Sequence, residues 1–328
     1  MIKITGTGSC IPDRCVRNEE LAPLVGLSPA GILKRTGIRE RRWAEKDQAS
    51  SDLAAVAVKK ALEAAGRGPE ELDAIILATT SPDMLFPSTA CLVQRKLGNR
   101  KAFAFDLSAS CAGFLFALST AHQFLRGEGI RTVAVVASEI KSRFIDVNDP
   151  ATAVIFADGA GAAIVEHVSE KTSSENGIRD IRVFSDGTQS GLIRIPAGGS
   201  RRPVSAETLK NDDHVIRMKG GPIFRSAVRK LVETTGNILE HHGLTPGDID
   251  HFVFHQANAR ILAAVAKRLS LPLERVVTTL DRFGNTSSAS IPMALDVAVR
   301  SGRVKPGDRI FLGGFGGGLN WGGALIRW

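Results

Sequence analysis

The most hydrophobic segments of this 328-residue chain are continuous apolar runs that do not alternate with polar residues. The clearest are AIILA at 74–78, VAVVA at 133–137 and RIFLGG at 309–314. Strands of this kind are typical of sheets that are covered on both faces. Segments 110–126 and 287–301 predict helices that are apolar nearly all round over their first turns. We therefore expect these two helices to lie buried between layers.

An internal repeat organises these elements. Residues 59–78 align without gaps with residues 236–255, and the same offset of 177 aligns 131–138 with 308–315. Each half then reads as helix, Gly/Pro turn, buried strand, buried helix and buried strand. Repetition at a fixed offset indicates a duplicated architecture.

Two such halves, packed through their central helices, predict an α/β fold with five layers, an α/β/α/β/α sandwich. We place the N-terminal half at 1–170 and the C-terminal half at 171–328, with the break in the polar stretch 167–178. The segment 187–215, which contains GGSRRP, is interpreted as a surface excursion.

The composition is that of a globular protein, with 43% hydrophobic and 23% charged residues. No apolar run reaches the length of a membrane-spanning helix, and MIKITGTGSCIP does not have the pattern of a signal peptide. We expect a cytoplasmic protein. Its four cysteines form no CxxC pair, so they are expected to be free thiols.

The net charge of +8 raises the question of a nucleic acid partner. The basic residues are scattered, Tyr is absent and aromatic residues make up only 5%, which disfavours nucleic acid binding. A basic rim suits an acidic protein partner or a phosphate-bearing substrate equally well.

Cys111 is the strongest candidate nucleophile among the four cysteines. Small residues precede it in DLSASCAGF, and a helix is predicted to begin at about its position. The unpaired N–H groups of a helix N-terminus would lower the pKa of the thiol. The alternative is a buried cysteine that only fills space.

His255 ends a buried strand, which is where α/β folds place catalytic groups. The repeat aligns it with Ala78, so one half carries a polar group where the other carries a methyl group. The alternative is a histidine that merely completes the strand end. The histidines are not at metal-ligand spacing, so no metal site is predicted.

Asn285 and a glycine-dense segment complete the candidate site. Asn285 follows Gly284 before the second buried helix, a pair that also occurs in ordinary turns. The segment GGFGGGLNWGG (313–323) would let a backbone N–H approach a reacting atom, as an oxyanion hole requires. Close packing of strands is the alternative.

Seven motifs together resemble β-ketoacyl-acyl carrier protein synthase III, a family of thiolase-fold condensing enzymes. They are RTGIRER (35–41), FPSTAC (86–91), SCAGF (110–114), FADGAGAA (156–163), HQANARI (255–261), LDRFGNTSSASIP (280–292) and FGGGLNWG (315–322). The resemblance covers essentially the whole chain. It implies an acyltransferase of fatty acid biosynthesis, with a thiolase-like five-layered sandwich.

The resemblance also implies roles for the candidate residues. Cys111 would take the acyl group from an acyl-CoA, with its own backbone N–H and that of Gly317 as the oxyanion hole. His255 and Asn285 would donate hydrogen bonds to malonyl-acyl carrier protein as it loses carbon dioxide. The product of this Claisen condensation would be a 3-oxoacyl-acyl carrier protein.

Further residues receive expected roles in the same way. The substrate-binding set is Arg35, Phe86, Arg143, Phe224, Ala257, Asn258, Ser287 and Phe315. The basic residues expected to dock the carrier protein are Arg225, Arg260, Lys267 and Arg268. The expected partners are acyl carrier protein, CoA thioesters and a second copy of the chain, with no separate cofactor, metal, membrane or nucleic acid.

Two positions depart from the family pattern. Gly31 and Pro150 stand where the family commonly has the Trp and Arg that hold the CoA adenine. Altered primer sites occur in branches that take a dicarboxylic primer such as glutaryl thioester, or polyketide and quinolone starters. A buried Arg143 would favour the dicarboxylic primer. Acyl transfer without condensation and a silent carrier-binding subunit also remain open.

Overall fold

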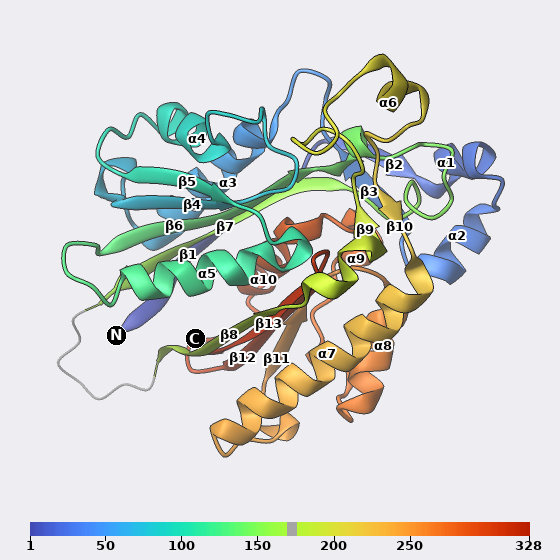
Figure 1. Ribbon diagram of the computed structural model, residues 1–328. Helices are drawn as coiled ribbons and strands as arrows, with labels where there is room; N and C mark the ends of the chain where they lie inside the picture. Colours follow the sequence, from blue (N-terminus) through green and yellow to red (C-terminus); the bar gives the residue numbers. More distant parts are fainter. Residues whose placement is uncertain (169–175) are drawn as a thin grey trace.

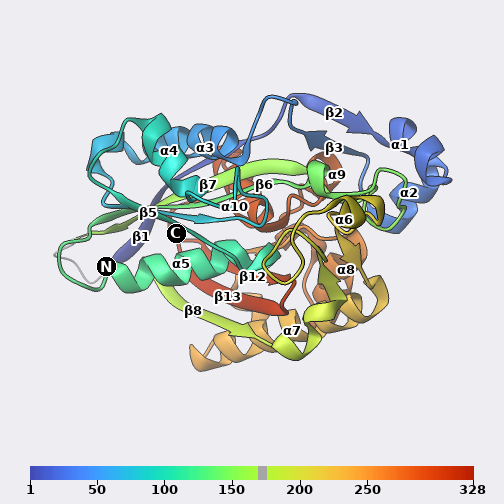
Figure 2. The ribbon, with the colours of Figure 1, turned by 45° about the horizontal axis from the view of Figure 1, so that its top comes forward.

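The computed structural model describes residues 1–168 and 176–328 (Figure 1). The predicted boundary between residues 170 and 171 lies outside the described residues. Two large sheets form, each covered by helices on both faces (Figures 1 and 2), and two smaller sheets have two strands each. In the described residues, no helix combines the length and apolar character needed to cross a membrane.

The first sheet is built from the N-terminal half. Its strands lie in the order β1 (Ile2–Cys10), β7 (Asp158–His167), β6 (Thr132–Ile140), β4 (Ala74–Ala78) and β5 (Phe103–Leu107). The three strands β6, β4 and β5 are parallel, and β7 and β1 join antiparallel at one side. The apolar runs at 74–78 and 133–137 are buried strands, as predicted.

The second sheet repeats most of this pattern. Its order is β11 (His251–Phe254), β12 (Arg309–Gly316), β13 (Asn320–Arg327) and β8 (Gly177–Ser185). β11 and β12 are parallel, whereas β13 and β8 are antiparallel to their neighbours. Strands β11 and β12 correspond to β4 and β6 at the offset of the sequence repeat.

Two helices lie between the sheets: α5 (Gly113–Phe124) and α10 (Ser290–Arg300). Each follows a 3₁₀ turn, η2 (Ser110–Ala112) before α5 and η7 (Ser287–Ala289) before α10. The predicted helices 110–126 and 287–301 therefore begin with this turn. Phe114 and Leu118 of α5 are fully buried, and each contributes about 1.5–3 kcal/mol by leaving water.

Four helices form the outer layers. α3 (Ser50–Ala65) and α4 (Thr89–Leu97) cover the first sheet, and α7 (Gly220–His241) and α8 (Ala259–Arg268) cover the second (Figure 1). The arrangement is the predicted α/β/α/β/α sandwich, and its central layer holds the largest apolar core. This core fixes α5 and α10, and with them the two turns that begin these helices.

The remaining elements lie at one end of the sandwich or connect the layers. The longer ones are β2 (Arg14–Arg17), α1 (Asn18–Val25), α2 (Pro29–Thr36), β3 (Glu40–Trp43), β9 (Ile193–Arg194), α6 (Ala206–Lys210), β10 (Arg217–Met218) and α9 (Leu280–Phe283). The short 3₁₀ turns are η1 (Pro69–Glu71), η3 (Lys141–Phe144), η4 (Gly187–Leu192), η5 (Pro246–Asp248) and η6 (Leu273–Arg275). Strands β9 and β10 pair with each other beside the N-terminal end of α7.

Candidate active site

Cys111 lies on the sharp turn between β5 and α5. The residue before it, Ser110, has a φ of 50°, in the left-handed region that side chains rarely adopt. Ser287, its counterpart in the second half, has a φ of 53°. Such a conformation costs about 1–3 kcal/mol and persists only where the surrounding structure imposes it. The turn presents the Cys111 thiol at the end of the central helix layer.

The Cys111 side chain is only 4% exposed. Burial raises the pKa of its thiol above the usual range. The Ser287 hydroxyl, 3.3 Å from Sγ, and the charge of Lys141 favour the thiolate, but they do not outweigh burial. The predicted lowering of this pKa is therefore wrong: α5 begins two residues after the cysteine, and desolvation dominates.

A buried carboxylate lies directly behind the nucleophile. Glu139, at the end of β6, accepts hydrogen bonds from Ser81 at 2.6 Å, Ser288 at 2.8 Å and Ser287 at 3.2 Å. It also pairs with Lys141, whose Nζ is 2.9 Å away. Burial opposes ionisation, yet Lys141 and the hydroxyl donors hold the pKa of Glu139 below its usual range. Ser287 thereby links this ion pair to the thiol.

His255 reaches the same place from the second half. It follows the last residue of β11, and its backbone N–H donates to Gly313 at 2.8 Å. Its ring is 4% exposed, and burial lowers its pKa to about 4, so the imidazole is neutral at physiological pH. Nδ1 lies 2.6 Å from the Ser290 hydroxyl, which also accepts the Gln256 N–H at 3.2 Å.

Asn285 is held between the halves by its own backbone. Its N–H donates to Ile155 at 3.0 Å, and its carbonyl accepts from Ala157 at 2.9 Å. Its side-chain Oδ1 accepts the Ser287 N–H at 2.8 Å. Because the oxygen is used in this way, the amide NH₂ is the end available to a ligand.

The glycine-dense segment brings β12 against the nucleophile. A Cβ on Gly316 would lie 2.5 Å from the Cys111 nitrogen, closer than side chains allow. The glycines of this segment therefore allow close packing, and the same close packing brings the backbone of β12 next to the nucleophile. Gly317 follows and lines the space around Cys111.

A cavity of about 410 Å³ leads from the surface to Cys111. Its inner wall is made by buried residues of both halves, and its mouth by exposed residues of α7 and α8. The predicted residues that line it are Cys111, Phe224, Arg225, His255, Ala257, Asn258, Arg260, Asn285, Phe315 and Gly317. The structure therefore gathers most of the predicted site around one cavity.

A second cavity, of about 360 Å³, lies on another side of Cys111. It shares Cys111, Phe156, Ile193 and Gly317 with the first. Its other lining residues include Thr80, Ser108, Ser110, Lys141, Arg194, Ile195, Ile216, Ser287 and Asn320. Cys111 thus stands between a channel to the surface and a second chamber.

Five predicted residues lie outside both cavities, Arg143 among them. Phe86 is 84% exposed, on the loop before α4, and Lys267 and Arg268 are exposed at the end of α8. The exposed Arg35 reaches the site only through its carbonyl, which accepts from Asn258 Nδ2 at 3.2 Å.

Arg143 is not buried, so the condition under which it would favour a dicarboxylic primer is not met. Its guanidinium is exposed and donates to the carbonyls of Glu45 at 2.9 Å, Lys46 at 2.9 Å and Gln48 at 2.7 Å. Because η3 turns the chain at this point, Lys141 faces inward and Arg143 outward.

Three contributors to the site were missed in the sequence. Glu139 lies near the end of the apolar strand β6 and Lys141 directly follows it, and a charged residue inside such a strand was a signal of a site. Ser290 lies in the motif that contains Asn285. Residues 193–195 were assigned to a surface excursion, but they line the second cavity.

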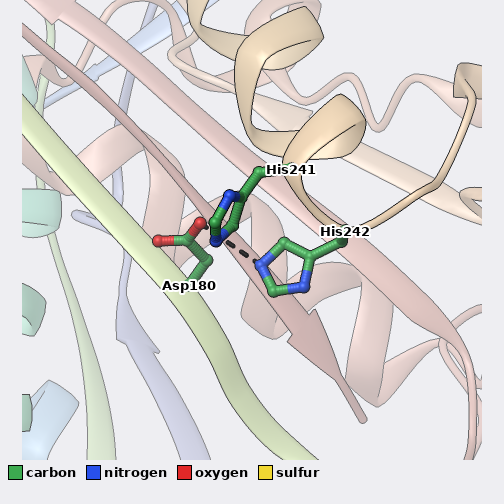
Figure 3. Close-up of side chains that lie close together, drawn as sticks. All are labelled: Asp180, His241 and His242. Carbon is green, nitrogen blue, oxygen red and sulfur yellow. Dashed lines mark hydrogen bonds and ion pairs between the residues drawn. The ribbon is translucent and has the colours of Figure 1, made fainter.

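Asp180, His241 and His242 form the one close group of potential metal ligands among the described residues (Figure 3). His242 Nε2 lies 3.2 Å from Asp180 Oδ2, at the end of α7. Arg182 pairs with the same oxygen at 2.8 Å, so the carboxylate is already neutralised. None of these residues lines either cavity beside Cys111.

Family comparisons agree with this geometry. The model of 3-oxoacyl-[acyl-carrier-protein (ACP)] synthase III matches residues 105–187, and that of its C-terminal part matches residues 239–328. The first match contains Cys111 and the second contains His255 and Asn285.

Full-length relatives show the same similarity. The beta-ketoacyl-[acyl-carrier-protein] synthase III of Methylococcus capsulatus is 46% identical, over 99% of this chain and 98% of that protein. The solved synthase III of Aquifex aeolicus overlays with a TM-score of 0.90 at 39% identity, covering all of both chains. That of Thermus thermophilus overlays with a TM-score of 0.90 at 41% identity, covering 99% of each. These matches confirm the predicted thiolase-like sandwich. The names of these three relatives give no support to the dicarboxylic, polyketide or quinolone primers.

Proposed function

Because the chain belongs to the 3-oxoacyl-[acyl-carrier-protein] synthase III family, we propose a two-stage reaction in which Cys111 carries the acyl group between the stages. The protein is an acyltransferase of the condensing type, a β-ketoacyl-acyl carrier protein synthase III of fatty acid biosynthesis. The observation that carries the mechanism is the position of Cys111, His255 and Asn285 around one cavity that opens to the surface.

In the first stage, an acyl thioester enters through this cavity and its carbonyl carbon is attacked by Cys111 Sγ. A carbon–sulfur bond forms to the cysteine, and the bond to the donor's sulfur breaks. The departing thiolate accepts the proton that the cysteine gives up. The N–H groups of Cys111 and Gly317 are proposed to bind the oxyanion. An acyl-CoA is the proposed donor.

In the second stage, a malonyl thioester on acyl carrier protein loses carbon dioxide. The electron pair of the broken carbon–carbon bond forms an enolate, and His255 and Asn285 donate hydrogen bonds to its oxygen. The enolate carbon attacks the Cys111 thioester, a carbon–carbon bond forms, and the cysteine sulfur leaves. No general base is required, because decarboxylation supplies the carbanion.

The surroundings of His255 suit a donor. The Ser290 hydroxyl accepts the Gln256 N–H, and its own hydrogen can be donated to His255 Nδ1. This assignment leaves the proton of the neutral ring on Nε2, where it can reach a ligand. Oδ1 of Asn285 is held by the Ser287 N–H, so its NH₂ group is the second donor.

The proposed partners follow from the molecular surface. Arg225 of α7 and Arg260 of α8 line the mouth of the first cavity, and Lys267 and Arg268 extend the basic face. This face would attract an acidic carrier protein. The exposed apolar side chains of Leu85 and Phe86 support a homodimer. The cytoplasm is the proposed location.

Mass spectrometry of Cys111 tests the function. An acyl thioester should add its acyl mass to the peptide that contains Cys111, and malonyl-acyl carrier protein should then remove the adduct and release carbon dioxide. The Cys91→Ser variant, which changes a half-buried cysteine outside both cavities, is the matched control and should behave like the wild type. An adduct that malonyl-acyl carrier protein does not discharge would refute the condensation stage.

A further inference from the structure

Ser287 lies between the nucleophile and the buried ion pair of Glu139 and Lys141. Its hydroxyl oxygen is 3.3 Å from Sγ of Cys111 and 3.2 Å from Oε1 of Glu139. A serine hydroxyl carries one hydrogen and can accept hydrogen bonds as well as donate one. Because the Glu139 carboxylate can only accept, the hydroxyl donates to it and accepts the S–H hydrogen of the free thiol.

Glu139 does not depend on Ser287 for its hydrogen bonds. Oε1 also accepts from Ser288 at 2.8 Å, and Oε2 accepts from Ser81 at 2.6 Å and pairs with Lys141 at 2.9 Å. The Ser287 hydrogen can therefore turn toward the sulfur without leaving a buried carboxylate oxygen unsatisfied. Rotation of one hydroxyl group is enough for this change, and no proton passes to the carboxylate.

Lys141 explains how an acidic group can lie behind a sulfur that becomes negative. Burial raises the pKa of Cys111, the Ser287 hydroxyl and the Lys141 charge lower it, and the Glu139 charge raises it by less than Lys141 lowers it. The side chains of the ion pair are only 4% and 0% exposed. Burying such a pair is unfavourable, and apolar residues of similar volume often give equal or better stability. Its place beside the nucleophile is therefore better explained by the reaction than by folding.

The other charged or titratable groups around the sulfur are neutral or lie at the surface. His255 faces the first cavity from the end of β11 and is neutral at physiological pH. Arg194 of β9 lines the second cavity, and Arg225 and Arg260 line the mouth of the first, and all three are exposed. The ion pair is thus the buried charge next to the sulfur.

We propose that Glu139 and Lys141 are positioning residues that hold the Ser287 hydroxyl beside the nucleophilic sulfur. The hydroxyl accepts the S–H hydrogen of the free thiol, and it donates its own hydrogen to the sulfur when the sulfur is negative. The sulfur becomes negative as it attacks the acyl thioester and again as it leaves after condensation. Its proton passes to the donor's departing sulfur in the first stage and returns from water in the second. The proposal rests on the proposed function and adds residues to both of its stages.

Charge variants test the ion pair with a readout that needs no acyl substrate. Alkylation of Cys111 by iodoacetamide is followed by peptide mass as a function of pH. Lys141→Met should shift the curve to higher pH, because the carboxylate then opposes the thiolate alone, and Glu139→Gln should shift it to lower pH, because the lysine charge is then unopposed. Each shift should change the rate about 3–10-fold on the rising part of the curve. Shifts in the same direction, or none in folded proteins, would overturn the proposal.

Two further variants guard this result. Arg143→Met removes an exposed charge from the same turn, η3, outside both cavities, and should leave the curve unchanged. The double variant Glu139→Gln/Lys141→Met leaves neither partner of the pair charged and should give a curve between those of the two single variants. A double-variant curve outside that interval, or an Arg143→Met shift as large as that of Lys141→Met, would overturn the assignment of the ion pair.

Ser287→Ala tests the hydroxyl and leaves both charges paired. The variant keeps the backbone N–H that Asn285 Oδ1 accepts, so the donor amide stays held. We expect the alkylation curve to move to higher pH and both acylation and condensation to slow about 10-fold, because the sulfur loses its donor in each stage. A loss confined to condensation, or wild-type rates in both stages, would overturn the role of the hydroxyl. If the wild type takes up no acyl group, the proposed function fails, whereas the alkylation curves still decide the role of the ion pair.

Discussion

The two halves of the chain carry the same turn before a central helix, with different chemistry on each. In the first half, Cys111 follows Ser110; in the second half, Ser288 follows Ser287, and both preceding serines have a positive φ. The Ser288 hydroxyl donates to Glu139 at 2.8 Å and lines neither cavity, whereas the Cys111 side chain lines both.

The same contrast holds at the ends of the equivalent strands. Ala78 ends β4 as a fully buried methyl group, and its counterpart His255 follows β11 and lines the first cavity. One half therefore supplies the nucleophile and the other supplies the donors. The duplication gives the two halves equivalent backbone positions. The side chain at each position determines which of the two equivalent residues takes part in the reaction.

Of the substitutions considered, replacing the nucleophile should lower the condensation rate most. Cys111→Ala should lower the condensation rate by at least about 1000-fold, because no covalent intermediate can form. Adding Ser288→Cys to this variant should restore nothing, because position 288 faces Glu139 and not a cavity. The rate is measured with malonyl-acyl carrier protein. Recovery of activity in the double variant would show that the two turns are interchangeable.

Removing the donors should affect one stage only. His255→Ala and Asn285→Ala should each lower the condensation rate by about 10²–10³-fold, as loss of a preorganised donor does. Acylation of Cys111 should change by less than about fivefold, since these donors act on the enolate. Separate assays of acylation and of product formation measure the two stages. Equal losses in both stages would contradict the division between halves.

Burial of His255 should make the stability of the protein depend on pH. Its folded-state pKa of about 4 lies below the unfolded value of about 6.5, so the unfolded chain binds the extra proton first. Stability is full above pH 6.5 and falls by about 3 kcal/mol between pH 7 and pH 4. Urea unfolding of the wild type and of His255→Asn, compared across this range, isolates the contribution. Parallel curves would contradict it.

The Cys111 thiol should give a smaller pH effect on reactivity. Because burial raises its pKa, its alkylation by iodoacetamide should still be rising at pH 9 and show no plateau below that pH. Lys141→Met should shift this curve to higher pH, since the lysine charge favours the thiolate. Loss of the alkylation product in Cys111→Ala identifies the reacting thiol. A plateau at neutral pH would show a thiol activated beyond what burial permits.

The sequence was sufficient for the features that repeat or that occupy a distinctive local pattern. Continuous apolar runs identified β4, β6 and β12, and the constant offset placed α5 and α10 between the sheets. The small residues around Cys111 and the position of His255 at a strand end identified two candidates, and both line the first cavity.

The features that could not be predicted from the sequence depend on which way a side chain points and on which distant segments pack against it. Lys141 and Arg143 are two residues apart on a 3₁₀ turn, and only the structure shows which one faces inward. The pKa of Cys111 depends on burial by segments far along the chain, including Gly316. For the same reason, residues 193–195 could not be recognised as a cavity wall.

If Cys111 and the donors His255 and Asn285 act in different stages, a single turnover separates their roles. The His255→Ala/Asn285→Ala variant is acylated at Cys111, freed of excess thioester and mixed with malonyl-acyl carrier protein, and the adduct is followed by mass. We expect the adduct to form at a near wild-type rate in this variant and then to persist, while the wild type discharges it. Discharge at the wild-type rate, with formation of the 3-oxoacyl product, would show that His255 and Asn285 are not needed in the condensation stage.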